Sequence, residues 1–179
     1  MKKFFIPLVA LTVSSSIFSA EPFTLSKVIQ AEGVSKDAIY SAVMGWVGTN
    51  FSLISEDTQI TDREAGLIVK PAVFNYGKNG IAYVCYSGRV FYKLKVQVRD
   101  GRFKVDLTSF SHGVKAGNAK ECGLGLITED EEYTNKGMSK KYHNEVWADI
   151  KKKAEAEAEK IFEAIAGIDF FGADQGNDW

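Results

Sequence analysis

The chain has 179 residues, of which 45% are hydrophobic and 25% are charged, and its formal net charge is -1 at pH 7. This length suits one domain with a sizeable hydrophobic core. A mildly acidic average offers no long-range attraction for nucleic acid or for an anionic membrane. We therefore expect a single domain that has no nucleic-acid partner.

The N-terminus has the three parts of a secretory signal peptide. Lys2 and Lys3 give a charged start, residues 4–13 are mainly apolar, and small or polar residues lead up to Ala20. The apolar part is too short to span a bilayer. We predict a signal peptide at residues 1–20, whose removal leaves 159 residues (179 minus 20) and a net charge of -3, because two lysines are lost. The mature protein is expected to be periplasmic or secreted, without a transmembrane span.

The next segment predicts a strand followed by a helix. Residues 23–31 alternate loosely between apolar or β-branched and polar side chains, which is typical of a strand. Over residues 36–47 the apolar side chains recur at helical spacing. Ser35, just before them, has the character of a helix N-cap.

Three further strands are predicted before residue 90. Residues 52–61 and 67–76 both mix apolar and polar side chains as strands do, and Pro71 places the second of them at an edge or at a bulge. Residues 77–80 have the composition of a hairpin turn. Residues 81–86 are rich in β-formers and predict either a separate strand or the first part of one long kinked strand over residues 81–98.

The strongest local signal is Asp100-Gly101, which lies between two runs of alternating hydrophobicity. Such a dipeptide predicts a two-residue hairpin with a type I′ turn, because both central residues need positive φ. It also sets a register in which Arg99 faces Arg102. One predicted face is apolar and pairs Val98 with Phe103, Val96 with Val105, Leu94 with Leu107 and Tyr92 with Ser109. The other face is hydrated and pairs Gln97 with Lys104, Lys95 with Asp106 and Lys93 with Thr108.

The C-terminal part predicts a loop and a long helix. Residues 112–125 contain four glycines and indicate a loop or an irregular edge strand. Residues 139–166 carry an apolar stripe at spacings of three and four, and Gly167 is the expected stop. Residues 168–179 form a short aromatic and acidic tail. We expect residues 21–167 to fold as one α+β domain, an antiparallel sheet with two helices on one face.

Cys85 and Cys122 are the two cysteines, so one intramolecular pairing is available. In an oxidising compartment a disulfide would tie a central strand to the glycine-rich segment, whereas buried thiols are a comparably common outcome. Both outcomes stay open. A disulfide here would be structural and not catalytic.

Motifs for catalysis, metal binding or phosphate loops are absent from the sequence. Ser109, Ser111 and His112 are close in sequence, and His143 with Asp149 or Glu145 would complete a triad in space. Serines at strand ends and surface histidines are far commoner than triads, so no catalytic residue is assigned. Two histidines with scattered carboxylates are also a poor basis for a zinc site. No metal or cofactor is expected.

Positions along most of the mature chain resemble a known family. They are Val34-Ser35-Lys36-Asp37, Tyr40, Trp46, Asp62, Glu64, Gly66, Ile68 and Val98-Arg99-Asp100-Gly101-Arg102-Phe103. They resemble an exported family of unknown function, domain of unknown function 4468, which has a TBP-like fold. The resemblance implies a β-α-β4-α sheet with both helices on one side, a location outside the cytoplasm and no established activity. It carries over no catalytic residue.

The sequence therefore predicts an exported, non-enzymatic binding or interaction module, whose partner would be an envelope protein or a small apolar ligand. Phe170, Phe171 and Trp179 are the candidate partner anchors, because exposed aromatics near a terminus can play that role. Folding of these rings back onto the sheet edge is the commoner outcome. Two alternatives stay open: a hydrolase that uses His112 or His143 with a nearby serine, and a carrier of an apolar small molecule. The carrier is suggested by the long C-terminal helix, which looks like that of a helix-grip domain.

Overall fold

The computed structural model describes residues 20–51, 59–131, 133 and 139–170. The predicted signal peptide lies outside them except for Ala20, as do Phe171 and Trp179 of the tail and most of the strand predicted over 52–61. The described elements are β1 (Leu25–Gln30), α1 (Lys36–Asn50), β2 (Ile60–Asp62), β3 (Leu67–Tyr76), η2 (Ile81–Tyr86), β4 (Gly88–Arg99), β5 (Arg102–Val114), η3 (Lys120–Cys122), β6 (Gly125–Leu126) and α2 (Lys140–Ala166).

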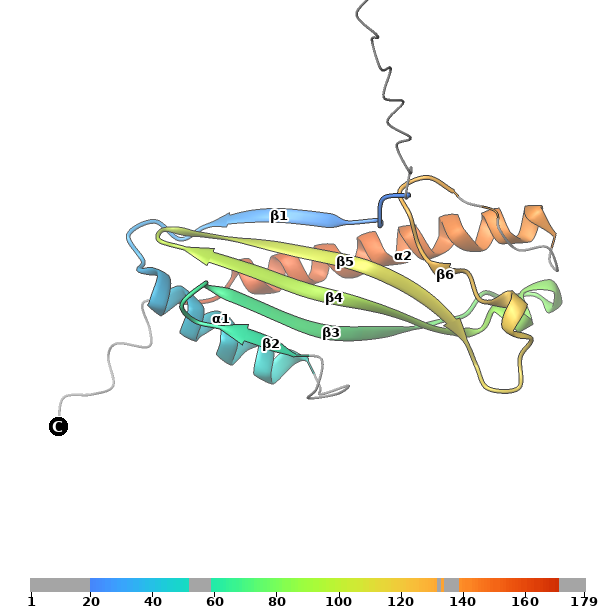
Figure 1. The fold of residues 1–179 in the computed structure, drawn as a ribbon, viewed down its shortest axis with the longest axis horizontal. Coiled ribbons are helices and arrows are strands. Elements are labelled where there is room, and N and C mark those ends of the chain that lie inside the picture. Colours follow the sequence, from blue (N-terminus) through green and yellow to red (C-terminus); the bar gives the residue numbers. More distant parts are fainter. Residues whose placement is uncertain (1–19, 52–58, 132, 134–138, 171–179) are drawn as a thin grey trace, which may run out of the picture.

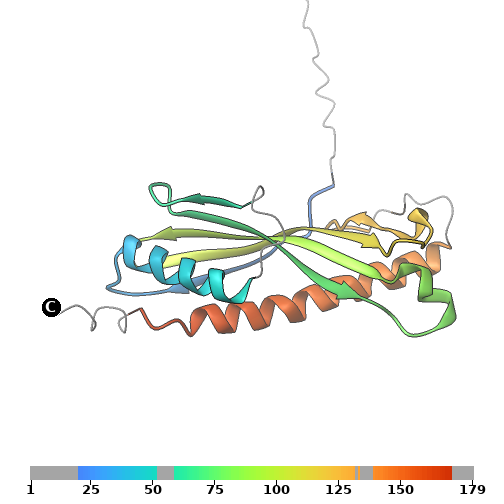
Figure 2. The same cartoon turned by 90° about the horizontal axis from the view of Figure 1, so that it is seen from below.

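The strands form one antiparallel sheet in the order β1-β5-β4-β3-β2, and β6 pairs with the far end of β5. Both long helices lie on the same side of this sheet, and α2 runs along most of its length (Figures 1 and 2). The predicted α+β class and the placement of two helices on one face are confirmed. We call the side that neither helix covers the open face.

The hairpin register is confirmed next to the turn. Val98 pairs with Phe103, Val96 with Val105 and Leu94 with Leu107, and all six side chains are at most 3% exposed beneath the helices. Only Gly101 of the turn has positive φ, at 71°, so the turn is not the predicted type I′. The two-residue length of the loop, which sets the register, is nevertheless correct.

Asp100 and Gly101 also fasten the hairpin to the start of α1. The Asp100 carboxylate accepts a hydrogen bond of 2.7 Å from the backbone amide of Lys36, the first residue of the helix. The Gly101 amide donates to the carbonyl of Val34 at 2.9 Å, and the Gly101 carbonyl accepts from the amide of Ala31 at 2.8 Å. Ser35 is the N-cap, as predicted, and accepts from the amide of Ala38. The first turn of α1 is therefore held partly by a carboxylate from the sheet, which also complements the helix dipole.

The hydrophobic core lies between the sheet and the two helices. The apolar stripe predicted for the C-terminal helix is buried on α2, and Ile39, Val43 and Val47 are buried on α1. Each such side chain contributes about 1.5 to 3 kcal/mol of transfer free energy. Ala154 and Ala158 sit at the middle of the α2 stripe, where small side chains allow the helix axis to approach the sheet.

A β-bulge overturns the predicted pairing of Tyr92 with Ser109. Between Phe91 and Lys93 of β4 the register shifts, so that Lys93 faces Thr108 while Phe91 faces Ser111. Ser109 takes φ of 57°, the one non-glycine residue with positive φ in the described part of the chain. The extra residue turns Phe110 into the core, where its ring stacks on Tyr92 with centroids 5.3 Å apart.

Other local predictions were also wrong. Residues 81–86 form the 3-10 helix η2 and not a strand, so residues 77–80 lead into a longer connection between β3 and β4 instead of a hairpin turn. The segment from residue 112, predicted as a loop or an irregular edge strand, begins with the last residues of β5 and continues through η3 to the short edge strand β6. At η2 tertiary packing overrides local composition.

The two faces of β4 predict opposite responses to substitution. Val96 is fully buried, and Val96→Lys would place an unpaired charge in the core, so we expect this variant to unfold. Lys95→Thr, on the open face, should change the free energy of unfolding by less than about 0.5 kcal/mol. Thermal unfolding followed by circular dichroism would compare them, and equal melting temperatures for the two variants would contradict the register.

Candidate functional site

The open face carries six cationic side chains on the two central strands. Lys95 pairs with Asp106, Arg99 with Arg102 and Gln97 with Lys104, so these positions share one face. Alternate residues of a strand lie roughly 6.7 Å apart on that face, and neighbouring strands are about 4.8 Å apart. We call this set the basic cluster: Arg89, Lys93, Lys95 and Arg99 of β4, and Arg102 and Lys104 of β5.

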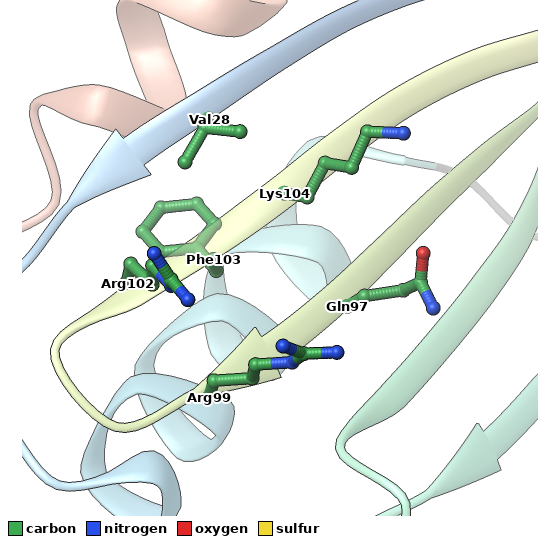
Figure 3. Close-up of a pocket in the computed structure, with 6 residues that line it drawn as sticks. All are labelled: Val28, Gln97, Arg99, Arg102, Phe103 and Lys104. Carbon is green, nitrogen blue, oxygen red and sulfur yellow. The ribbon is translucent and has the colours of Figure 1, made fainter.

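A pocket opens at the turn end of the basic cluster. Its volume is about 260 Å³, and residues of the neighbouring strands β1, β5 and β4 line it. In Figure 3 the helix α1 lies behind these strands, which places the pocket on the open side of the sheet. The lining residues are Val28, Gln97, Arg99, Arg102, Phe103 and Lys104.

The carboxylates near the pocket form hydrogen bonds or ion pairs with other groups of the protein. Asp100 bonds the backbone of α1, as described above. Asp106 accepts from Lys104 at 2.8 Å and from the Ser26 hydroxyl at 2.5 Å. Within the described ranges, Lys104 is therefore the one member of the basic cluster with an ion pair.

Arg99 and Arg102 stand directly opposite each other across the turn. Like charges at such cross-strand positions are destabilising. A guanidinium presents a planar fork of donors that matches an oxyanion in two parallel hydrogen bonds. Two unpaired guanidiniums beside a pocket can therefore hold an anionic group, which would also remove their mutual repulsion.

His112 is buried and both of its ring nitrogens contact the backbone. Nδ1 accepts from the amide of Leu124 at 3.3 Å, so Nε2 carries the proton and donates to the carbonyl of Tyr86 at 3.0 Å. Burial lowers the pKa of this imidazole, against a smaller opposite effect of the Tyr86 hydrogen bond. The ring ties β5 to the segments on either side of it. Ser111 alternates with it along β5 and pairs with Phe91, so the two side chains point to opposite faces.

The other proposed triad members are not brought together. His143 is buried, with its Nδ1 3.6 Å from a carboxylate oxygen of Glu131. Asp149 accepts instead from the hydroxyl of Tyr76 at 3.0 Å, and Glu145 from that of Tyr83, which raises the pKa of Tyr83 to about 12. These carboxylates therefore hold the β3–β4 connection to α2.

Cys85 and Cys122 face each other between η2 and η3 as thiols. Burial, and next a hydrogen bond with Cys85, raise the pKa of Cys122 to about 12. The amide group of Asn118 joins the same two segments by donating to the carbonyls of Cys85 and Ser87. The structure thus brings the predicted pair together without a bond between them.

Phe170 is the one candidate partner anchor among the described residues. Its ring is half-buried and meets that of Phe103 edge-on, with centroids 5.9 Å apart. Because the Phe103 ring is buried beneath the helices, the start of the tail packs on the helix side of the sheet, opposite the basic cluster. A second, more open pocket of about 200 Å³ lies between the two helices, beside Trp46, Phe51 and Ile161.

Sequence reasoning placed the members of the basic cluster other than Arg89 on the hydrated face but did not recognise them as a site. The signal was available in the parity of the strands, because the register puts Lys93, Lys95 and Arg99 on one side with Arg102 and Lys104. The overall net charge of -1 concealed this local excess.

The described residues contain neither a candidate metal site nor a candidate membrane-spanning helix. No group of three or more histidine, cysteine, aspartate or glutamate side chains there is arranged to hold a metal ion. None of the helices in the same residues has the length and apolar character needed to cross a bilayer.

The antiparallel sheet with two helices on one face defines a TBP-like α+β domain, and comparison with known proteins agrees. Residues 26–113 match the family model described as a domain of unknown function (DUF4468) with TBP-like fold. This match confirms the resemblance noted in the sequence. No curated protein matches the chain.

Two crystal structures are similar in fold. A DUF4468 family protein from Bacteroides ovatus ATCC 8483 has a TM-score of 0.56 and 16% identity, over 84% of this chain and 89% of the other. A TBP-like protein from Parabacteroides distasonis ATCC 8503 has a TM-score of 0.53 and 14% identity, over 83% of this chain and 95% of the other. At such identities the likeness concerns the fold alone.

The lowered pKa of His112 predicts a loss of stability in acid. An unfolded histidine titrates near pH 6.5, above the folded value, so this contribution is complete above about pH 6.5 and declines as the pH falls below it. Urea unfolding at about pH 7.5 and pH 5.5 should show a smaller decline for His112→Gln than for the wild type, whereas His143→Gln should keep the decline due to His112. Equal declines for wild type and His112→Gln would contradict the assignment.

The contact of Phe170 with Phe103 predicts that the start of the tail contributes to stability. Phe170→Ala should lower the free energy of unfolding by about 1 kcal/mol, because an aromatic pair and half-buried apolar area are lost. Glu163→Ala, at an exposed position of the last turns of α2, is the matched control and should change little. Urea unfolding measures both, and an unchanged Phe170→Ala variant would favour a free anchor.

Proposed function

We propose that this protein is an exported, non-enzymatic binding module that holds its partner on the open face of its sheet. The observation that carries the proposal is the basic cluster, which lies on a face that neither helix covers and has one ion pair within the described residues. Cationic side chains that are left without partners on a rigid sheet are available to a ligand. A rigid sheet also lowers the entropic cost of binding.

Apolar side chains on the same face support a macromolecular partner. Val28 and Ile60 lie near its two edges, on β1 and β2, and are 53% and 55% exposed. Phe91 is 39% exposed beside the guanidinium of Arg89. Binding surfaces combine such anchors with charged groups that steer the partner and fix its orientation.

The roles of the polar groups favour binding over catalysis. The His112 nitrogens are taken up by backbone groups, and Asp149 and Glu145 by tyrosine hydroxyls. Export is supported by the charged start and short apolar run at residues 1–20. The partner would then be met outside the cytoplasm, as an envelope protein or another extracytoplasmic molecule.

Site-specific photo-crosslinking in cells of the source organism tests the proposal. A photoreactive residue at position 95 or 97, on the open face, should give a discrete adduct. The same residue at position 159, an exposed position of α2, is the control and should not. Adducts from position 159 alone, equal adducts from both faces, or none from positions 95 and 97 would overturn the proposal.

A further inference from the structure

We propose that the pocket at the turn end of β4 and β5 binds the phosphate group of a phosphate monoester. The inference rests on the proposed function, because it names the chemistry that the open face recognises at this pocket. The pocket is lined by Arg99, Arg102 and Lys104 together with Gln97 and Val28.

The charge around the pocket matches a dianion. Arg99, Arg102 and Lys104 are cationic, and Asp106, which is paired with Lys104, is the carboxylate at their side. Among the lining residues, this leaves the two guanidiniums of Arg99 and Arg102 without an ion pair in the described part of the chain. A phosphate monoester carries close to two negative charges at pH 7, with a second pKa near 6.

The turn holds the two guanidiniums where one group can meet both. A two-residue loop makes Arg99 and Arg102 direct cross-strand neighbours, whose Cβ atoms in such a pair are about 5 Å apart. Asp100, the nearest carboxylate in sequence, accepts a hydrogen bond from the Lys36 amide of α1 and makes no ion pair with either arginine among the described residues. The loop itself is fixed by the Gly101 hydrogen bonds to Val34 and Ala31. The repulsion between the arginines is thus built into the fold, and a bound dianion relieves it.

The remaining lining residues favour an ester over free phosphate. Val28 pairs with Lys104 from the neighbouring strand β1 and is 53% exposed, so it offers an apolar edge beside the charged groups. Gln97 pairs with Lys104 from the other side and offers an uncharged donor and acceptor. A phosphate with a carbon body would engage the arginines and Val28 together, as free phosphate would not.

Isothermal titration of the full mature chain with phenyl phosphate, inorganic phosphate and benzyl alcohol tests the proposal. Wild type should bind phenyl phosphate saturably and more tightly than inorganic phosphate, and benzyl alcohol not at all. Arg99→Gln and Arg102→Gln should each weaken binding of phenyl phosphate by about tenfold or more. Lys93→Gln removes one positive charge from the same face, six residues along β4 from Arg99. It should weaken binding of phenyl phosphate by less than about twofold.

Binding to lipid vesicles distinguishes a lipid headgroup from a soluble ester as the source of the phosphate. If phosphatidylcholine vesicles that contain phosphatidic acid also bind, and Arg102→Gln abolishes this, the ester is a lipid headgroup. If phenyl phosphate binds and the vesicles do not, the ester is a soluble molecule.

Two outcomes would overturn the site. One is a loss of phenyl phosphate affinity in Lys93→Gln equal to that in Arg102→Gln, which would mean that the positive charge of the whole face attracts the ligand. The other is the lack of saturable binding to phenyl phosphate. Crosslinks from position 95 that persist while phosphate binding is absent would overturn this inference alone and leave the proposed function standing.

Discussion

The two-residue reversal at Asp100 and Gly101 is the constraint on which the rest of this structure depends. By fixing the register of β4 and β5, it sends one set of alternate side chains beneath the helices and the other to the open face. The same reversal is bonded to residues 31, 34 and 36, so it also determines where α1 starts relative to the sheet. Core, helix position and basic cluster are consequences of one turn, since a slip by one residue would exchange the two faces.

Periodicity and turn chemistry were sufficient for most of the fold. The helices, the central hairpin and the buried side chains of β4 near the turn all follow from alternation or from spacings of three and four. The failures have non-local causes. Residues 81–86 are β-formers by composition, but they wrap the end of the sheet as a 3-10 helix, where Tyr83 and Tyr86 bond to groups from other elements. The bulge depends on Ser109 adopting positive φ, for which serine has no strong local preference.

The candidate site was only half visible in the sequence. Its arginines and lysine lie within eight residues of Gln97 and were assigned to the correct face. Val28, however, reaches the pocket because β1 pairs with β5 across more than seventy residues of chain, which no local pattern indicates. The net charge of the chain also does not show how its charged side chains are distributed over the surface. Among the described residues, Asp106 is the one carboxylate of β4 and β5, whose open face otherwise keeps an excess of cations.

The bulge at Ser109 has a consequence for how this chain can vary. Before it, odd-numbered residues of β5 such as Val105 and Leu107 are buried, and after it the even-numbered Phe110 and His112 are. Deleting Ser109 would restore uninterrupted pairing, because Phe110 would then face Tyr92 while Ser111 and His112 kept their partners Phe91 and Val90. Related chains that are one residue shorter at this point can therefore keep the same apolar and polar positions downstream. A change of one residue in length is thus absorbed at the bulge, whereas a deletion elsewhere in β5 would exchange the faces of the residues beyond it.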